Sequence, residues 1–186
     1  MLFRSKDGKP TTPLEQRRQT AIDEKALLQM AIDGYLRGFE VDPRNHYVGI
    51  NALTLMHLQV HLGLREADDP QLATLAGAVR FAAAAASRRR DDDPFFAFST
   101  LADLEVLSGT VASATEAYRA ACARHDSNRF ALNSCCDQLK LLRDLAFRPE
   151  VVEPAISVLE TGLDRLDPDR DRKSTRLNSS HLVISY

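Results

Sequence analysis

The sequence predicts an all-α fold of about seven antiparallel helices, and three observations lead to that prediction. Apolar residues recur at three- and four-residue spacing through most of the chain, which is the period of an amphipathic helix. No segment alternates between apolar and polar residues with a period of two, as a half-buried strand would. Alanine and leucine are abundant, whereas glycine and proline number only 8 each among 186 residues.

Proline, glycine and aspartate signals set the ends of the predicted helices. The first helix ends at Asp42-Pro43, because the residue before a proline avoids the α region, and the second ends near Gly63. Asp69-Pro70 and Asp93-Pro94 each place an N-cap aspartate before a proline at the first helical position. Pro149 ends the sixth helix. The predicted helices are 20–39, 47–62, 70–90, 94–108, 111–124, 128–147 and 150–166.

One helical repeat domain is expected over 20–168, with a poorly ordered start over 1–19 and a disordered tail over 169–186. The stretch 171–186, DRKSTRLNSSHLVISY, lacks helical periodicity and resembles the conceptual translation of a sequencing adapter. Residues 1–5 resemble the tail of the opposite adapter. The alternative for the tail is an ordinary polar terminus. We therefore argue function from residues 6–170, which we expect to be a fragment of a longer protein.

Charge and cysteine content exclude several classes of protein. Lys+Arg number 24 and Asp+Glu 26, a net charge of -2, whereas nucleic-acid-binding proteins usually concentrate basic charge. Cys122, Cys135 and Cys136 form neither a disulfide framework nor a zinc-ligand pattern, so we expect reduced, mostly buried thiols. The start has no apolar signal region, and no apolar run reaches the length of about 20 residues that spans a membrane. A cytoplasmic protein is expected.

A recurring set of small and aromatic residues predicts tetratricopeptide-like repeats. In such a repeat, small residues let two helices cross closely, an aromatic residue lies between them and a proline follows. Ala31, Tyr35, Gly38 and Pro43 have that spacing, and a second set has Asp126 in the proline position. Because one repeat cannot bury its face alone, we expect the helices to stack into an α-α superhelix, with a generic antiparallel bundle as the alternative. The second set consists of Ala102, Gly109, Ala114, Tyr118 and Ala121.

Three segments resemble one family, the TRAF-binding, tetratricopeptide-like region of the apoptosis-signal-regulating kinases (MAP kinase kinase kinases) and its bacterial relatives. The most specific is 38–58, GFEVDPRNHYVGINALTLMHL. Segment 95–109 resembles an aromatic-rich part of the family but departs from it at Phe96, Ser99 and Ala102-Asp103. Segment 133–142 resembles the Asn-x-x-x-Leu region near the family's end. The motif residues in the first segment include Gly38, Phe39, Asp42, Pro43, Arg44, Tyr47, Gly49 and Asn51.

The resemblance covers most of residues 26–145 and implies a helical regulatory region beside effector domains of a larger signalling protein. In the animal kinases that region binds TRAF adaptors. In bacteria the neighbouring domains can be signalling or hydrolase domains, and the resemblance implies no particular ligand.

Several residues could carry chemistry, but each has a simpler structural interpretation. His57 and His61 lie four apart on one predicted helix, a spacing that can hold a metal, yet no third ligand is evident. The run 88–93, three arginines and three aspartates, could bind an anion or could end one helix and cap the next. Asn51 is expected to hydrogen-bond the inter-helix loop, and Asp42 and Arg44 to pair across the turn at Pro43.

The sequence therefore favours a protein–protein interaction and regulatory scaffold and predicts no enzyme. It contains no glycine-rich phosphate loop and no nucleophile elbow, so we name no catalytic, cofactor-binding or metal-binding residue. The expected partner is a protein, either a peptide or an adjoining domain of the same parent protein. The alternatives are a helical enzyme, a bundle that binds a small ligand or metal, and a structural spacer.

Overall fold

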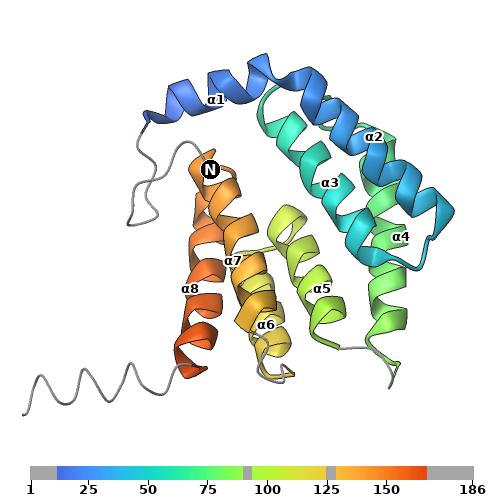
Figure 1. The fold of residues 1–186 in the computed structure, drawn as a ribbon, viewed down its shortest axis with the longest axis vertical. Coiled ribbons are helices and arrows are strands. Elements are labelled where there is room, and N and C mark those ends of the chain that lie inside the picture. The colour runs from blue at the N-terminus through green and yellow to red at the C-terminus, as the bar shows by residue number, and fades with distance from the viewer. Residues whose placement is uncertain (1–11, 90–93, 125–128, 167–186) are drawn as a thin grey trace, which may run out of the picture.

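A computed structural model of the chain describes residues 12–89, 94–124 and 129–166 (Figure 1). These ranges contain eight α-helices and no strand, which confirms the all-α prediction for the part of the chain they cover. No helix in these ranges combines the length and apolar character needed to cross a membrane. The helices are α1 (Leu14–Asp23), α2 (Lys25–Val41), α3 (His46–His61), α4 (Pro70–Ala86), α5 (Pro94–Ser108), α6 (Val111–Cys122), α7 (Arg129–Asp144) and α8 (Pro149–Arg165).

The single helix predicted over 20–39 is wrong, because the chain forms two helices there. α1 begins at Leu14, and the break falls at Glu24, whose φ of -87° and ψ of 16° lie outside the helical region. α1 was missed because it is mostly polar and carries no apolar stripe, so its periodicity is weak. The predicted poorly ordered start therefore overlaps an ordered helix.

The other helices begin close to the predicted positions, and side-chain caps explain where three of them begin. Asp69 accepts a 2.9 Å hydrogen bond from the Gln71 amide at the start of α4, and Asn45 accepts one from Val48 at the start of α3. Thr110 and Ser113 cap α6 reciprocally. α4 ends at Ala86, so Arg88 and Arg89 follow the helix rather than forming its last turn. The predicted cap at Asp93 and the Asp126 position lie outside the described residues.

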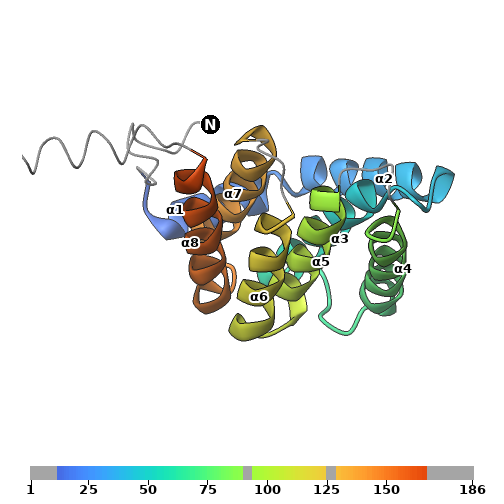
Figure 2. The same ribbon diagram turned by 90° about the horizontal axis from the view of Figure 1, so that it is seen from below.

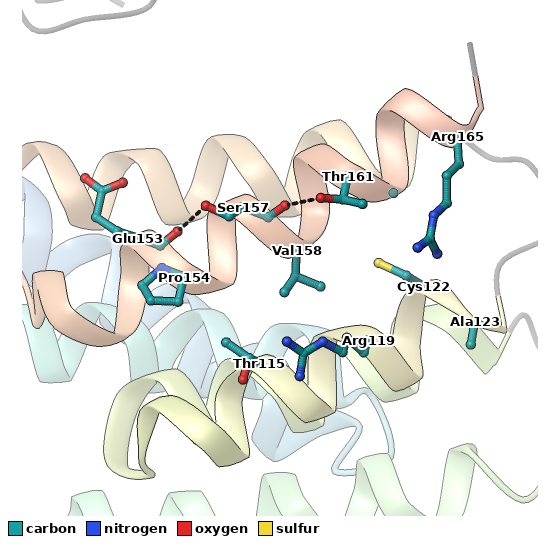
Figure 3. Close-up of a pocket in the computed structure, with 11 residues that line it drawn as sticks. Thr115, Arg119, Cys122, Ala123, Glu153, Pro154, Ser157, Val158, Thr161 and Arg165 are labelled. Carbon is teal, nitrogen blue, oxygen red and sulfur yellow. Dashed lines mark hydrogen bonds between the residues drawn. The ribbon is translucent and has the colours of Figure 1, made fainter. Parts of the chain in front are cut away.

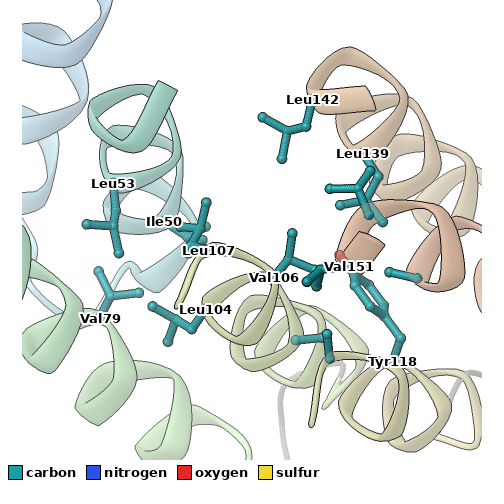
Figure 4. Close-up of a cluster of buried hydrophobic side chains, with 14 of the residues drawn as sticks. Ile50, Leu53, Val79, Leu104, Val106, Leu107, Tyr118, Leu139, Leu142 and Val151 are labelled. Carbon is teal, nitrogen blue, oxygen red and sulfur yellow. The ribbon is translucent and has the colours of Figure 1, made fainter. Parts of the chain in front are cut away.

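α2, α3, α4 and α5 each pack against the next helix, and α8 packs against both α6 and α7 (Figure 2). α3 also contacts α5, so α5 lies near the middle of the packed helices. One hydrophobic core runs through them (Figure 4). In this core Ile50 and Leu53 of α3 lie near Val79 of α4, and Leu139 and Leu142 of α7 lie on the other side of α5.

The two sets of repeat residues have different surroundings. Ala102, Ala114, Tyr118 and Ala121 are fully buried where α5 and α6 pack together. In the first set, Ala31 and Gly38 are exposed, Tyr35 is half-buried and Pro43 is exposed. α2 makes few contacts with α1 and packs mainly on α3, where a Cβ atom on Gly38 would lie 3.0 Å from Val48, whereas Ala31 is exposed.

α1 crosses the upper end of the molecule in Figure 1 and contacts the ends of two helices that are distant in sequence. The Arg17 Nε donates a 2.7 Å hydrogen bond to the carbonyl of Asp144, the last residue of α7. The Arg18 guanidinium donates one of 3.3 Å to the carbonyl of His61, the last residue of α3. α1 is thus held at the C-terminal ends of α3 and α7.

Candidate functional site

A groove of about 770 Å³ lies between α6 and α8 (Figure 3). α6 contributes Thr115, Arg119 and Cys122, which recur at helical spacing on one face. α8 contributes a longer row on its facing side. That row consists of Glu153, Pro154, Ser157, Val158, Thr161, Gly162 and Arg165.

A glycine allows the two walls to approach each other. A Cβ atom built on Gly162 would lie 3.2 Å from the Cys122 Sγ and 3.7 Å from a methyl of Leu132. A side chain at this position would therefore be in tight contact with the Cys122 thiol, which would have to shift. Pro154 lies near the other end, in the interior of α8, where its ring forms part of the wall (Figure 3).

The hydroxyl groups of the groove are bonded within their own helices. Thr161 Oγ1 donates a 2.8 Å hydrogen bond to the Ser157 carbonyl, and Ser157 Oγ donates one of 3.2 Å to the Glu153 carbonyl. Thr115 Oγ1 donates 2.9 Å to the Val111 carbonyl. The charge of the walls therefore comes from Arg119, Arg165 and Glu153, two cations against one anion.

The thiol in the groove is not activated. Burial raises the pKa of Cys122, and the nearby Arg165 guanidinium offsets part of that effect. A thiol whose pKa is raised stays protonated at neutral pH, and the thiolate is the nucleophilic form. Cys122 is therefore part of a wall rather than a reacting group. The three cysteines carry free thiols, as the sequence predicted.

The most strongly perturbed ionisable groups lie in the core instead, where α5, α6 and α7 meet. Tyr118 donates a hydrogen bond to the carboxyl of Asp103, which is only 8% exposed. Burial raises the pKa of Asp103 to about 7 and, helped by the charge of Asp103, raises that of Tyr118 well above its usual range. Burial also raises the pKa of Cys135 to about 12, although its hydrogen bond with Ser99 opposes the shift. None of these residues lines the groove.

The residues of the 38–58 motif lie at the end of α2, in the α2–α3 turn and along α3, and none of them lines the groove. The predicted pair of Asp42 and Arg44 forms, with 3.2 Å between Oδ1 and Nε, and this contact lowers the pKa of Asp42. Asn51 donates to the carbonyl of Tyr47, one turn back in its own helix, rather than to the inter-helix loop. Tyr47 is 56% exposed.

Two glycines of the same motif lie where helices approach closely. A Cβ on Gly49 would lie 2.5 Å from Val79 and 2.9 Å from the ring of Phe39, so glycine lets α3 contact α2 and α4. A Cβ on Gly38 would lie 3.0 Å from Val48. The motif residues that the structure brings together thus pack α2 on α3.

The histidine pair is engaged in packing. The His61 Nε2 lies 3.0 Å from the Leu145 carbonyl, and its ring meets Phe147 edge-on at 5.5 Å. Burial lowers the pKa of His57, and the charge of Arg148 lowers it further. Within the described ranges, no group of three or more His, Cys, Asp or Glu side chains could hold a metal ion.

Sequence reasoning missed both the groove and the buried cluster. The groove needed the pairing of α6 with α8, which are not consecutive helices, although Pro154 and Gly162 inside one predicted helix were a visible signal. For the cluster, a signal lay in segment 95–109, which we compared with the family that it resembles. Two positions at which segment 95–109 departs from the pattern of that family, Ser99 and Asp103, are members of the cluster.

We compared the chain with protein-family models, with curated proteins and with solved structures, and none of the three comparisons gave a match.

Proposed function

We propose that this chain is a protein-interaction and regulatory module that binds a peptide segment of a partner protein in the groove between α6 and α8. The observation that carries this proposal is the groove, which two helices line along their facing sides. Its volume of about 770 Å³ is within the range of ligand-binding clefts. Its lining alternates apolar groups such as Val158 and Pro154 with charged ones, which suits a segment that carries both kinds of side chain.

The charge of the groove favours an acidic segment. Arg119 is 62% exposed and forms a 3.7 Å surface ion pair with Glu116, Arg165 is also exposed, and Glu153 is the one acidic residue of the lining. Arginine binds carboxylates through paired N–H groups, so two arginines at separate positions can fix both the register and the direction of a bound peptide. Rim charges of this kind mainly increase the rate of association.

The resemblance of residues 38–58 to the TRAF-binding region of the apoptosis-signal-regulating kinases and its bacterial relatives supports the same function. We propose that the chain belongs to a larger cytoplasmic signalling protein and that its partner is a peptide or an adjoining domain of that protein. The exposed Ala31 face of α2 is consistent with a further repeat stacking there in the parent protein.

The alternative of a helical enzyme is less well supported, because its two requirements occur in different places. An active site needs perturbed ionisable groups that face a cavity. The perturbed groups Asp103, Tyr118 and Cys135 are packed in the core, while the groove presents a protonated Cys122 and surface arginines. We therefore propose that the chain is not an enzyme.

A selection of short random peptides on the full chain tests this proposal. Enriched peptides are expected to be acidic, and the double variant Arg119→Glu/Arg165→Glu should weaken their binding by about tenfold or more. Ser157→Tyr should also weaken binding by filling the groove, since Ser157 is exposed there. Arg88→Glu, which reverses an exposed arginine beyond α4, is the matched control and should leave binding unchanged. Peptides that bind all four proteins equally well, or a selection without enrichment, would contradict the proposal.

A further inference from the structure

α1 covers a small surface made by the ends of two other helices. Arg17 and Arg18 are adjacent, and each hydrogen-bonds the carbonyl of a terminal residue, Asp144 in α7 and His61 in α3. Terminal carbonyls of a helix have no partner within it and carry the negative end of the helix dipole, so two cationic groups suit them. Behind these contacts, Ala21 and Ile22 of α1 pack against an apolar cluster of Leu58, Leu62 and Leu145.

This attachment is light for a helix of this length. No residue of α1 is buried, and Leu14 is exposed. Among the residues that the structure describes, these contacts include two side-chain hydrogen bonds and one small apolar cluster, which is separate from the main core. Elements with few buried apolar contacts open at a lower free energy than the global unfolding of a protein.

A single exposed residue, Glu24, joins α1 to α2. The Glu24 amide donates a 3.1 Å hydrogen bond to the Thr20 carbonyl, and the Glu24 carbonyl accepts one of 3.1 Å from the Leu28 amide. Glu24 therefore already makes the hydrogen bonds of a helix with residues on both sides of it. Its ψ of 16° differs by roughly 60° from the helical value. Rotation at this residue alone would join α1 and α2 into one continuous helix over 14–41.

We propose that α1 exchanges between two copies of this chain, leaving its own α3 and α7 and docking on the same surface of a second copy. The second copy is the occupant because α1 and the surface it fits occur in the same chain, and exchange recreates contacts that already exist. The straight helix over 14–41 carries α1 away from its own surface. Reciprocal exchange satisfies both copies and closes a two-fold dimer.

The first experiment measures the mass of the full chain by light scattering over a range of concentrations, after brief warming and slow cooling. A dimer is expected to accumulate with concentration. Glu24→Ala should favour it over Glu24→Gly by about fivefold for each hinge, since alanine is the better helix former. Arg17→Ala/Arg18→Ala should leave the dimer fraction unchanged, because these variants lose the same hydrogen bonds in the closed monomer and in the exchanged dimer.

A mixing experiment distinguishes exchange from any other mode of association. A copy with a defective α1, Ile22→Asp, and a copy with a defective surface, Leu62→Asp, should each remain monomeric alone, yet form a mixed dimer together. If Leu62→Asp does not fold, the milder change Leu62→Ala at the same surface position replaces it in the mixture. A chain that stays monomeric throughout would overturn the proposal. So would a dimer that is insensitive to Glu24, or a pair of defective copies that forms no mixed dimer.

Discussion

The Tyr118 hydroxyl donates a hydrogen bond to the Asp103 carboxyl inside the α5–α6 pair, where Tyr118 is fully buried. Both residues lie on helices that also carry the small residues Ala102, Ala114 and Ala121 at their contact. The small residues let the two backbones approach, and the phenol then reaches a carboxyl that has little access to water. This arrangement has a measurable consequence for stability as a function of pH.

Asp103 should make the protein less stable as the pH rises from about 4 to about 7. Burial raises its pKa in the folded chain to about 7, against about 3.9 in the unfolded chain. In that window the unfolded chain has lost a proton that the folded chain keeps, so the free energy of unfolding falls by up to about 1.4 kcal/mol per pH unit. Below about pH 4 and above about pH 7, the contribution of Asp103 to the free energy of unfolding no longer changes with pH.

The variant Asp103→Asn isolates this effect, because the amide oxygen can still accept the Tyr118 hydrogen bond without ionising. We expect it to be more stable than the parent chain at pH 8 by about 2 to 4 kcal/mol, and similar to it at pH 4. Urea unfolding at both pH values measures the difference in the free energy of unfolding between variant and parent. Taking this difference cancels the contribution of carboxylates such as Asp69, whose lowered pKa acts in the opposite direction. An equal difference at both pH values would contradict the raised pKa.

Gly49→Ala should destabilise the fold by about 1 to 3 kcal/mol, because overpacking a well-filled core costs that much. The added methyl would lie 2.5 Å from Val79 and 2.9 Å from the ring of Phe39. Gly77→Ala is the matched control, since Gly77 is also inside a helix but has no atom within 4 Å of its built Cβ. It should stabilise the chain by about 0.5 to 1 kcal/mol through helix propensity. Thermal unfolding of the two variants should therefore shift in opposite directions.

Arg148→Ala should destabilise the fold by about 1.5 to 3 kcal/mol, the range for hydrogen bonds that involve a charged group. The Arg148 guanidinium donates 2.8 Å to the Val106 carbonyl and also bonds the Gly109 carbonyl, which satisfies the C-terminal end of α5. Its backbone is left-handed, with φ of 40°, a conformation that disfavours every residue except glycine and a few polar ones.

Arg148→Gly separates these two effects. It loses the same hydrogen bonds but relieves the backbone strain, so it should be less destabilising than Arg148→Ala in a urea titration. In both variants the pKa of His57, followed by NMR, should rise toward its usual value without reaching it, because burial is the larger cause of its depression. If the glycine variant had a lower free energy of unfolding than the alanine variant, position 148 would not be strained.

Apolar periodicity and local capping residues were enough to predict most of the fold. Asp69-Pro70 set the start of α4 in the structure, because an N-cap and a proline at the first helical position act within one turn. α1 could not be predicted in this way, since its sequence offers no apolar face and its position depends on residues as distant as Asp144. The sequence pattern also placed Ala31 in a close helix contact, yet Ala31 is exposed in the part of the chain that the structure describes.

The candidate site was harder to predict than the fold. Arg119 and Arg165 line the groove from α6 and α8, which pack together although α7 lies between them in sequence. Helical spacing contains no information about which helices become neighbours. The burial of Asp103 was not predicted, because aspartate is rarely buried unless it is paired. Its partner Tyr118 was identified only as a repeat residue, so the hydrogen bond between them needed coordinates.

The contact between Arg17 and Asp144 also bears on the order in which the chain folds. Most helices from α2 to α8 pack against near neighbours in sequence, so these contacts form with short loops and can nucleate locally. Arg17 and Asp144 are 127 residues apart, and closing so long a loop costs more chain entropy than any adjacent pairing. Docking of α1 should therefore be the last event of folding, after both of its receiving helices are in place. In a partly folded chain, α2 to α8 would thus already be packed together while α1 had not yet docked on α3 and α7.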